Sequence, residues 1–461
     1  MATKVFLHSL GCPKNLVDSE MMLGLVARDG GEIVLDPEAA DVLIVNTCGF
    51  IGDAKKESID AILDLARHKQ GHPGKRLVVT GCLVQRYGAD LQAALPEVDA
   101  FLGTGDFVRL PEILGSASRS DASSYGGAAH LLPDLTIPRV RTGQFFSAYL
   151  KVSEGCDHRC SFCIIPKIRG RHESRSLESV LAEAEALGAD GVIELNLIAQ
   201  DLTAYGHDRG DGSSLSRLLR GLARIDGLRW IRLLYTFPRY VTDDLLDTIA
   251  NEEKVCAYID MPLQHISGRI LQRMRRERDG AAVRRLLQRI RHRIPGVAVR
   301  TAFIVGFPGE TEADFAELVR FVQEARFERV GVFRYSQEEG TAAATFDEQV
   351  PASITRARRA SLMRAQAAIS AEANRRLVGS QQTVLICGQD DQGRLYGRLP
   401  TQAPEIDGVV HVWGDVATGT ITDARITGSN AYDLRAEAIP ADGDTSPLTR
   451  PVNISKLPPL L

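Results

Sequence analysis

The feature that most constrains the fold is a regular alternation of apolar runs and amphipathic segments between residues 144 and 374. Six of the apolar runs predict buried strands, and amphipathic segments that predict helices follow them. Helical crossovers join neighbouring strands in parallel, and six units are fewer than the eight of a closed barrel. The pattern predicts an α/β chain with a central partial (β/α)6 TIM-like barrel. The expected strands are 146–153, 191–198, 230–237, 257–264, 299–306 and 329–336, and the expected helices include 177–187, 215–225, 243–251, 281–294, 311–324 and 354–377.

Three cysteines form a C-x3-C-x2-C loop directly after the first of these strands: Cys156, Cys160 and Cys163, called here the loop cysteines. A closed structural zinc site uses four ligands, and here the only nearby fourth is His158, inside the loop. Three thiolates on a four-iron cluster would leave one iron open to the amino and carboxylate groups of S-adenosylmethionine. The loop therefore indicates an iron–sulfur cluster, with a zinc site or plain buried cysteines as the alternative.

Three further cysteines, Cys12, Cys48 and Cys82, each follow an apolar run in the first part of the chain. These runs alternate with helices expected from about Ser19 and over 54–69, which predicts a parallel α/β sheet. Carboxyl ends of parallel strands share one edge, where ligands bind. We expect these sheet-edge cysteines to converge on a second three-thiol site, with incidental buried cysteines as the alternative. Cys256 and Cys387 lack such a pattern and are expected in the core.

The last part of the chain changes character. Short β-like runs separated by Gly, Asp and Pro predict a small all-β barrel of the oligonucleotide-binding type. The expected division is an N-terminal α/β domain (1–114), a linker rich in Gly, Ser and Ala (115–143), the barrel (144–374), the small β-barrel (375–441) and a tail (442–461).

Composition narrows the cellular setting. The start lacks a secretory signal, and no apolar run approaches the length of a membrane span. Eight cysteines in such a chain favour metal or redox sites over a disulfide framework. A net charge of -4 gives no global attraction to nucleic acid. We expect a cytoplasmic protein without membrane contact, and a monomer.

The loop cysteines, Phe162 and the barrel pattern resemble the radical S-adenosylmethionine superfamily. Together with the sheet-edge cysteines and the small barrel, the chain resembles its methylthiotransferase family over nearly the full length. The resemblance implies two [4Fe-4S] clusters, an auxiliary one on Cys12, Cys48 and Cys82 and a radical one on Cys156, Cys160 and Cys163. It also implies a TRAM domain, S-adenosylmethionine as methyl donor and radical source, insertion of a methylthio group into a C–H bond, and a flavodoxin or ferredoxin as reductant.

Weaker signals concern the cofactor. In the family, the segment corresponding to GFPGET (306–311) lines S-adenosylmethionine, which implicates Gly306 and Gly309. A capping box at Thr311 explains the same turn equally well. Glu194, Gln200 and Asp201 are expected to end the second barrel strand and to face the barrel mouth, unless they are ordinary polar loop residues. Glu194 and Gln200 are the candidates there for binding S-adenosylmethionine.

Members of the family modify either transfer RNA or an aspartate of ribosomal protein uS12. The segments 9–20 and 154–175 resemble the uS12 branch, including Pro13 and Lys14 after the first cysteine. Residues 379–437 hold four arginines against eight acidic residues, a balance that suits a basic protein better than RNA. We therefore expect methylthiolation of the β-carbon of that aspartate. The alternatives are a transfer-RNA adenosine methylthiotransferase and a non-catalytic metal- or iron–sulfur-binding RNA protein.

Overall fold

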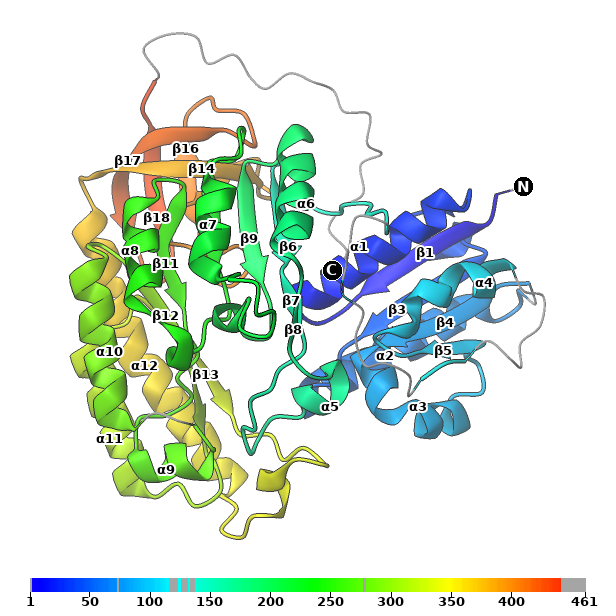
Figure 1. Cartoon of the computed structure of the whole chain (residues 1–461), viewed down its shortest axis with the longest axis horizontal. Coiled ribbons are helices and arrows are strands. Elements are labelled where there is room, and N and C mark those ends of the chain that lie inside the picture. Colours follow the sequence, from blue (N-terminus) through cyan, green and yellow to red (C-terminus); the bar gives the residue numbers. More distant parts are fainter. Residues whose placement is uncertain are drawn as a thin grey trace.

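The computed structural model describes residues 2–72, 74–115, 123–125, 132, 137–276 and 279–440. Most of the predicted linker 115–143 and the whole predicted tail 442–461 therefore lie outside the described residues. Figure 1 shows the N-terminal sheet beside the central barrel, with the small C-terminal barrel at one end of it.

The N-terminal sheet has five parallel strands in the order β2-β1-β3-β4-β5. Alternate residues of β3 point to opposite faces, so Ile44 packs with helices α1 and α4, and Val45 packs with α2 and α3. The elements are β1 (Lys4–Ser9), α1 (Pro13–Arg28), β2 (Glu32–Ile33), β3 (Val42–Thr47), α2 (Gly52–Lys69), β4 (Arg76–Gly81), α3 (Cys82–Ala94), β5 (Ala100–Leu102) and α4 (Leu110–Gly115).

The start of α1 differs from the expectation. The helix begins at Pro13, directly after Cys12, and not near Ser19. Cys12 is the N-cap residue but makes no side-chain capping hydrogen bond, so the usual Ser, Thr, Asp or Asn signal is missing. Proline at the first helical position is the signal that marks this start.

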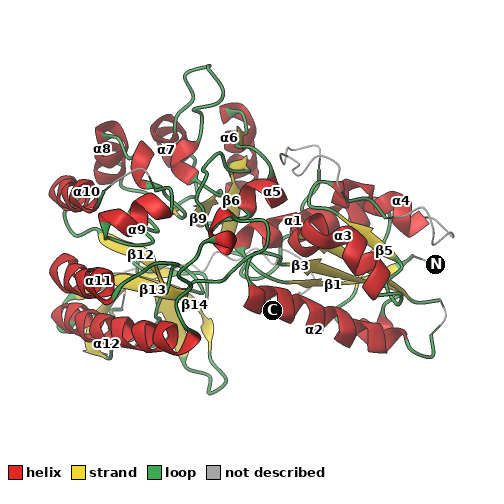
Figure 2. Ribbon diagram, turned by 90° about the horizontal axis from the view of Figure 1, so that it is seen from below, coloured by secondary structure: helices red, strands yellow, loops and turns green. Residues whose placement is uncertain are grey.

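The centre of the molecule is a six-stranded parallel sheet in the order β13-β12-β11-β10-β9-β6, which confirms the predicted open barrel. Figure 2 shows its helices on the outside of the curved sheet. The strands are β6 (Ser147–Lys151), β9 (Glu194–Ile198), β10 (Trp230–Leu233), β11 (Val255–Asp260), β12 (Ala298–Val305) and β13 (Arg329–Arg334). The helices are α5 (Ile165–Arg169), α6 (Leu177–Ala189), α7 (Leu215–Ala223), α8 (Asp243–Asn251), α9 (Gly268–Arg273), α10 (Gly280–Arg293), α11 (Glu312–Ala325) and α12 (Ala352–Leu377), and β7 (Ser153–Glu154) pairs with β8 (Glu173–Ser174).

The C-terminal strands close into a barrel in the order β14-β15-β16-β18-β17, as expected for the last domain. They are β14 (Gln381–Gln389), β15 (Leu395–Arg398), β16 (Val410–Trp413), β17 (Ile421–Ser429) and β18 (Leu434–Ala438). The sequence patterns indicated only the first four strands. The fifth, LRAEA, alternates small and charged residues and carries little of the β-branched character that marks a strand.

Both outer domains contact the central barrel. Leu385, Cys387 and Ala403 of the C-terminal barrel share one apolar cluster with Tyr149 and Trp230 of the central strands. Cys387 and Cys256 are both buried, as expected. The N-terminal domain meets the carboxyl ends of the strands, where Glu338, after β13, pairs with Lys55 and Arg86. No helix among the described residues has the length and apolar character needed to cross a membrane.

Candidate active site

The loop cysteines lie at the carboxyl end of the first barrel strand, in the segment between β7 and α5. The N–H of Cys156 donates to the carbonyl of Gly170 at 3.1 Å, which closes the loop at its base. Gly155 has a φ of 76°, and a Cβ there would lie 1.8 Å from the carbonyl oxygen of Arg171. Only glycine allows the two chain segments to approach so closely.

The three thiols of this loop lie near one another. Burial raises the pKa of Cys156 and of Cys163 to about 12, and the neighbouring Cys160 thiol acts in the same direction on both. Arg276 places Nη1 3.7 Å from Cys160 Sγ. The guanidinium thus brings a positive charge beside a candidate cluster ligand.

His158, considered above as a fourth ligand, is engaged elsewhere. Its Nε2 lies 2.7 Å from Asp201 Oδ2, and its ring stacks on Phe237 with a centroid separation of 3.7 Å. Asp201 is held in turn by Thr203, whose N–H and hydroxyl both donate to Oδ1. The imidazole is thus part of a packed polar cluster at the barrel mouth.

The sheet-edge cysteines are brought together from three separate loops. Cys12 precedes α1, Cys48 follows β3, and Cys82 is the first residue of α3 after β4. Gly11 has a φ of 94°, and a Cβ there would lie 2.9 Å from Cys48 Cβ. A glycine is therefore required where the first two loops meet.

Burial raises the pKa of Cys48 to about 12, and the Cys82 and Cys12 thiols act in the same direction. Asn15 braces this arrangement from the first turn of α1. Its Nδ2 donates to the carbonyls of Leu10 and Thr47, and its Oδ1 lies 3.6 Å from Cys82 Sγ. Sequence reasoning missed Asn15, although its position three residues after Cys12 was a usable signal.

The two groups of cysteines are neighbours in space. Cys82 packs in one buried cluster with Ile164 and Ile168 of the barrel domain, and Ile164 directly follows Cys163. Arg169 also reaches from α5 toward the sheet edge, where Cys82 and Cys12 raise its pKa against the opposing effect of burial. The edge of the N-terminal sheet and the mouth of the barrel thus form one site.

Buried ion pairs join the two domains around this site. Arg169 Nη1 lies 2.7 Å from Asp18 Oδ2 and 3.2 Å from Glu154 Oε2. Lys151 pairs with both of these carboxylates. Burial opposes ionisation of Glu154, but Lys151 and Arg169 outweigh it and hold its pKa at about 2. None of these charged residues was singled out from the sequence, because Asp18, which joins them across the two domains, is distant along the chain from Lys151 and Arg169.

Gly306 and Gly309 lie in the turn after β12, as expected, with φ values of 75° and 80°. A Cβ on Gly306 would lie 2.4 Å from Thr355 Oγ1 of α12, so packing alone requires glycine there. The predicted capping box at Thr311 and Asp314 is present. Glu310 accepts hydrogen bonds from the N–H groups of Gly306 and Phe307, which holds the turn in shape.

Gln200 follows β9 at the barrel mouth and donates a hydrogen bond to Glu154. Glu194 is a different case, and its predicted position is wrong. It is the first residue of β9, not part of its carboxyl end, and it is completely buried. There it pairs with Arg398 of the C-terminal barrel and with Arg232. The apolar run that predicts this strand begins three residues before β9 itself. Glu194 was therefore expected farther along the strand than it lies.

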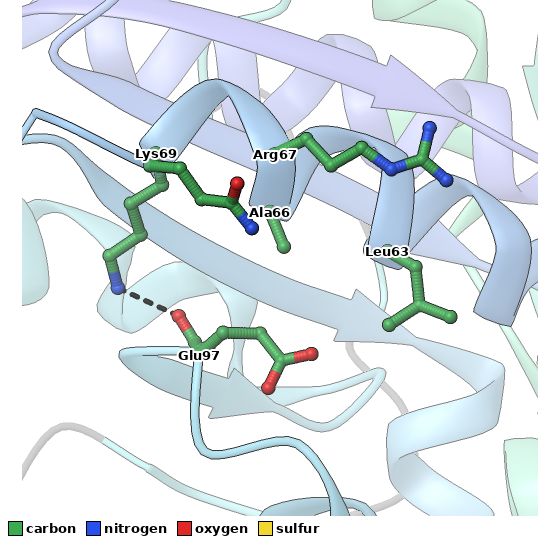
Figure 3. A pocket seen from close by; sticks show the side chains of 6 residues that line it. Leu63, Ala66, Arg67, Lys69 and Glu97 are labelled. Atoms are coloured by element: carbon green, nitrogen blue, oxygen red, sulfur yellow. Dashed lines mark hydrogen bonds between the residues drawn. The ribbon is translucent and has the colours of Figure 1, made fainter.

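One surface cavity lies away from these residues. It has a volume of about 600 Å³ and is lined by the second half of α2 and by Glu97, whose carbonyl accepts a hydrogen bond from Lys69 at 2.7 Å (Figure 3). Cys48 lies before the opposite end of α2. This cavity brings no cysteine and no barrel residue to its walls, so it is not part of the site.

In the described residues, no set of three His, Cys, Asp or Glu side chains is arranged to hold a single metal ion. An open six-stranded parallel barrel with three cysteines in the loop after its first strand defines the class of radical S-adenosylmethionine enzymes. Family models agree: the Radical SAM superfamily matches residues 150–322, the TRAM domain 378–439, and Uncharacterized protein family UPF0004 residues 4–103.

Proteins of similar sequence place the chain more narrowly within the radical S-adenosylmethionine enzymes. The chain is 51% identical to "Ribosomal protein uS12 methylthiotransferase RimO" of Geobacter sulfurreducens, over 95% of this chain and 98% of that protein. It is 49% identical to the RimO protein of Anaeromyxobacter sp. (strain Fw109-5), over 97% and 96% of the two chains. The chain belongs to the RimO family of methylthiotransferases.

Solved structures show the same fold at much lower identity. The radical S-adenosylmethionine methyltransferase TsrM from Kitasatospora setae aligns with a TM-score of 0.53 at 16% identity, covering 72% of this chain and 73% of that one. The cobalamin-dependent enzyme OxsB aligns with a TM-score of 0.50 at 13% identity, covering 74% and 54%. These similarities concern the fold alone.

Proposed function

We propose that this chain transfers a methylthio group to the β-carbon of an aspartate in ribosomal protein uS12, in the cytoplasm. The observation that carries the proposal is the match to RimO proteins over nearly the full length of both chains. The joined site at the barrel mouth supports it, because sulfur insertion needs a radical source and a sulfur source at the same carbon.

The proposal assigns the loop cysteines to a radical [4Fe-4S] cluster and the sheet-edge cysteines to an auxiliary one. Three thiols at each place and a glycine where each loop must pass closely fit such groups, and His158, the candidate fourth ligand of the loop, contacts Asp201. When bound, the clusters and S-adenosylmethionine supply reductive sulfonium cleavage, hydrogen abstraction and the methylthio group. A flavodoxin or ferredoxin would be the electron donor, and the enzyme would work as a monomer.

The chain's own residues then orient and shield the reaction. The turn with Gly306 and Gly309 and the side chain of Gln200 are assigned to S-adenosylmethionine. Glu194 is left out of this assignment, because Arg398 and Arg232 occupy its carboxylate. The domain division given above, with the TRAM domain at 375–441, is part of the same proposal.

Charge on the C-terminal barrel favours a protein substrate over RNA. Arg398 is buried against Glu194 and Asp407 is buried near Arg300, so neither contributes to the outer surface. Three arginines stay exposed there: Arg394, Arg425 and Arg435. The exposed acidic side chains are Asp391, Glu405, Asp415, Asp423 and Glu437. A surface of this sign attracts a basic ribosomal protein and repels phosphates.

The test is anaerobic reconstitution followed by incubation with S-adenosylmethionine, a reductant and either uS12 or transfer RNA. Mass spectrometry should show one methylthio group on an aspartate of uS12 and none on a nucleoside. Modification of an adenosine with unmodified uS12 would replace this proposal by a transfer-RNA methylthiotransferase. Bound zinc in place of iron would support a non-catalytic protein instead.

A further inference from the structure

Lys14 is a buried cation without an anionic partner at the joined site. It is the second residue of α1, two positions after Cys12, and only 8% of it is exposed. In the described residues its ammonium forms no salt bridge with a carboxylate, and its Nζ lies 3.2 Å from the centroid of the Tyr235 ring. The nearby cations Lys151 and Arg169, by contrast, each pair with Asp18 and Glu154.

Tyr235 places this contact at the mouth of the barrel. It follows β10 and adopts a φ of 62°, which is unusual for a non-glycine residue. The strained backbone is held from both sides: the N–H of Tyr235 donates to Asp260 at 3.0 Å, and its carbonyl accepts from the N–H of Leu202 at 2.9 Å. Residues held in such conformations cluster at functional sites. The aromatic ring thus supports the ammonium between the sheet-edge cysteines and the barrel.

Burying an ammonium without a carboxylate costs free energy, because only an opposite charge or hydrogen bonds can offset the loss of its hydration. A face-on aromatic ring offsets part of that free energy. The first turn of α1 also contains no acidic residue, although anions are stabilised at a helix N-terminus. An anionic ligand at this point would pair with the Lys14 ammonium and would also be stabilised by the N-terminus of α1.

We propose that Lys14 binds the carboxylate of the substrate aspartate, with Tyr235 holding the ammonium in place. This inference rests on the proposed function. The carboxyl group is bonded directly to the β-carbon that receives the sulfur, so the cation that binds it must lie close to the point of sulfur delivery. Lys14 meets that requirement, being two residues from Cys12. Selection of aspartate over asparagine would follow, because a neutral amide cannot offset the charge of the buried ammonium as a carboxylate does.

The test is a double-mutant cycle between enzyme and substrate. Wild-type uS12 and a uS12 variant with asparagine at the modified aspartate are bound to the reconstituted full-length enzyme and to Lys14→Met. Binding is measured by fluorescence anisotropy, anaerobically and without S-adenosylmethionine, so that turnover does not enter. Lys14→Met should weaken binding of the aspartate form at least tenfold and leave binding of the asparagine form unchanged. Lys56→Met, which alters an exposed lysine of α2, is the matched control.

Equal weakening of both uS12 forms, or of neither, would overturn the proposal. A loss of iron in Lys14→Met with unchanged binding of both forms would assign Lys14 to balancing the charge of the auxiliary cluster, and would overturn it too. If Lys14→Met does not fold, the same cycle is run with Lys14→Gln. Failure of the proposed function is recognised separately, because the wild-type enzyme would then leave uS12 unmodified.

Discussion

Arg169 of the barrel domain and Asp18 of the N-terminal domain form an ion pair of 2.7 Å in which both side chains are buried. The pair joins the segment that follows the loop cysteines to the helix that follows Cys12. The relative position of the two cysteine groups therefore depends on buried charge as well as on apolar packing.

Asp18→Asn should destabilise the protein by roughly 3 kcal/mol, because Lys151 and Arg169 would be left with a single carboxylate, Glu154, between them. The measurement is the urea midpoint of the full chain at pH 7. Asp60→Asn removes an exposed pair with Lys56 and should leave the midpoint near that of the wild type. Equal midpoints for the two variants would show that the buried pair does not stabilise the domain contact.

Cys156→Ala should abolish formation of 5′-deoxyadenosine, whereas Cys48→Ala should retain it and stop methylthio transfer. The reason is that the two variants disrupt different proposed clusters. Iron analysis should fall from about eight atoms per chain to about four in each variant. Modified uS12 produced by Cys48→Ala would disprove the auxiliary role of the sheet-edge cysteines.

His158→Ala should retain the iron of the radical cluster, because the imidazole already contacts Asp201 and Phe237. Cys160→Ala serves as the comparison and should lose about half of the iron. Iron and zinc are measured in both proteins by mass spectrometry. Metal loss in His158→Ala equal to that in Cys160→Ala would identify the histidine as a ligand.

Glu194→Gln should weaken the contact between the C-terminal and central barrels in a pH-dependent way. Burial opposes ionisation of Glu194, but Arg398 and Arg232 outweigh it and lower its pKa from 4.5 to about 2. A carboxylate with a lowered pKa contributes its full stability above about pH 4.5 and loses it as the pH falls toward 2. The wild type should therefore unfold at higher temperature than Glu194→Gln at pH 7, and the difference should shrink below pH 4.5.

Circular dichroism melts from pH 7 to pH 3 provide this measurement. Glu112→Gln alters an exposed carboxylate of α4 and is the control that should follow the wild type at each pH. A difference between Glu194→Gln and the wild type that stays constant over the whole range would contradict the assigned role of the buried carboxylate.

The order of the strands and helices could be predicted because it follows from local patterns. The β12 run of apolar residues and the amphipathic α11 are each recognisable within a dozen residues. Errors occurred where the local signal was poor. Cys12 cannot cap a helix as serine does, so the predicted start of α1, near Ser19, lies too late in the chain. The strand β18 has too few β-branched residues to be recognised as a strand.

Both cysteine groups could be predicted without coordinates: the loop cysteines by their spacing, and the sheet-edge cysteines because parallel strands end at a common edge. The folded chain was needed to see that the two groups adjoin, that Arg169 meets Asp18, and that Lys14 lies over Tyr235. These partners are separated by many residues along the chain, and no local periodicity encodes which buried charges will meet. The same limit applies to Glu194, whose partner Arg398 belongs to another domain. Strand ends follow from backbone geometry, whereas the pairing of distant charges follows from how whole domains pack.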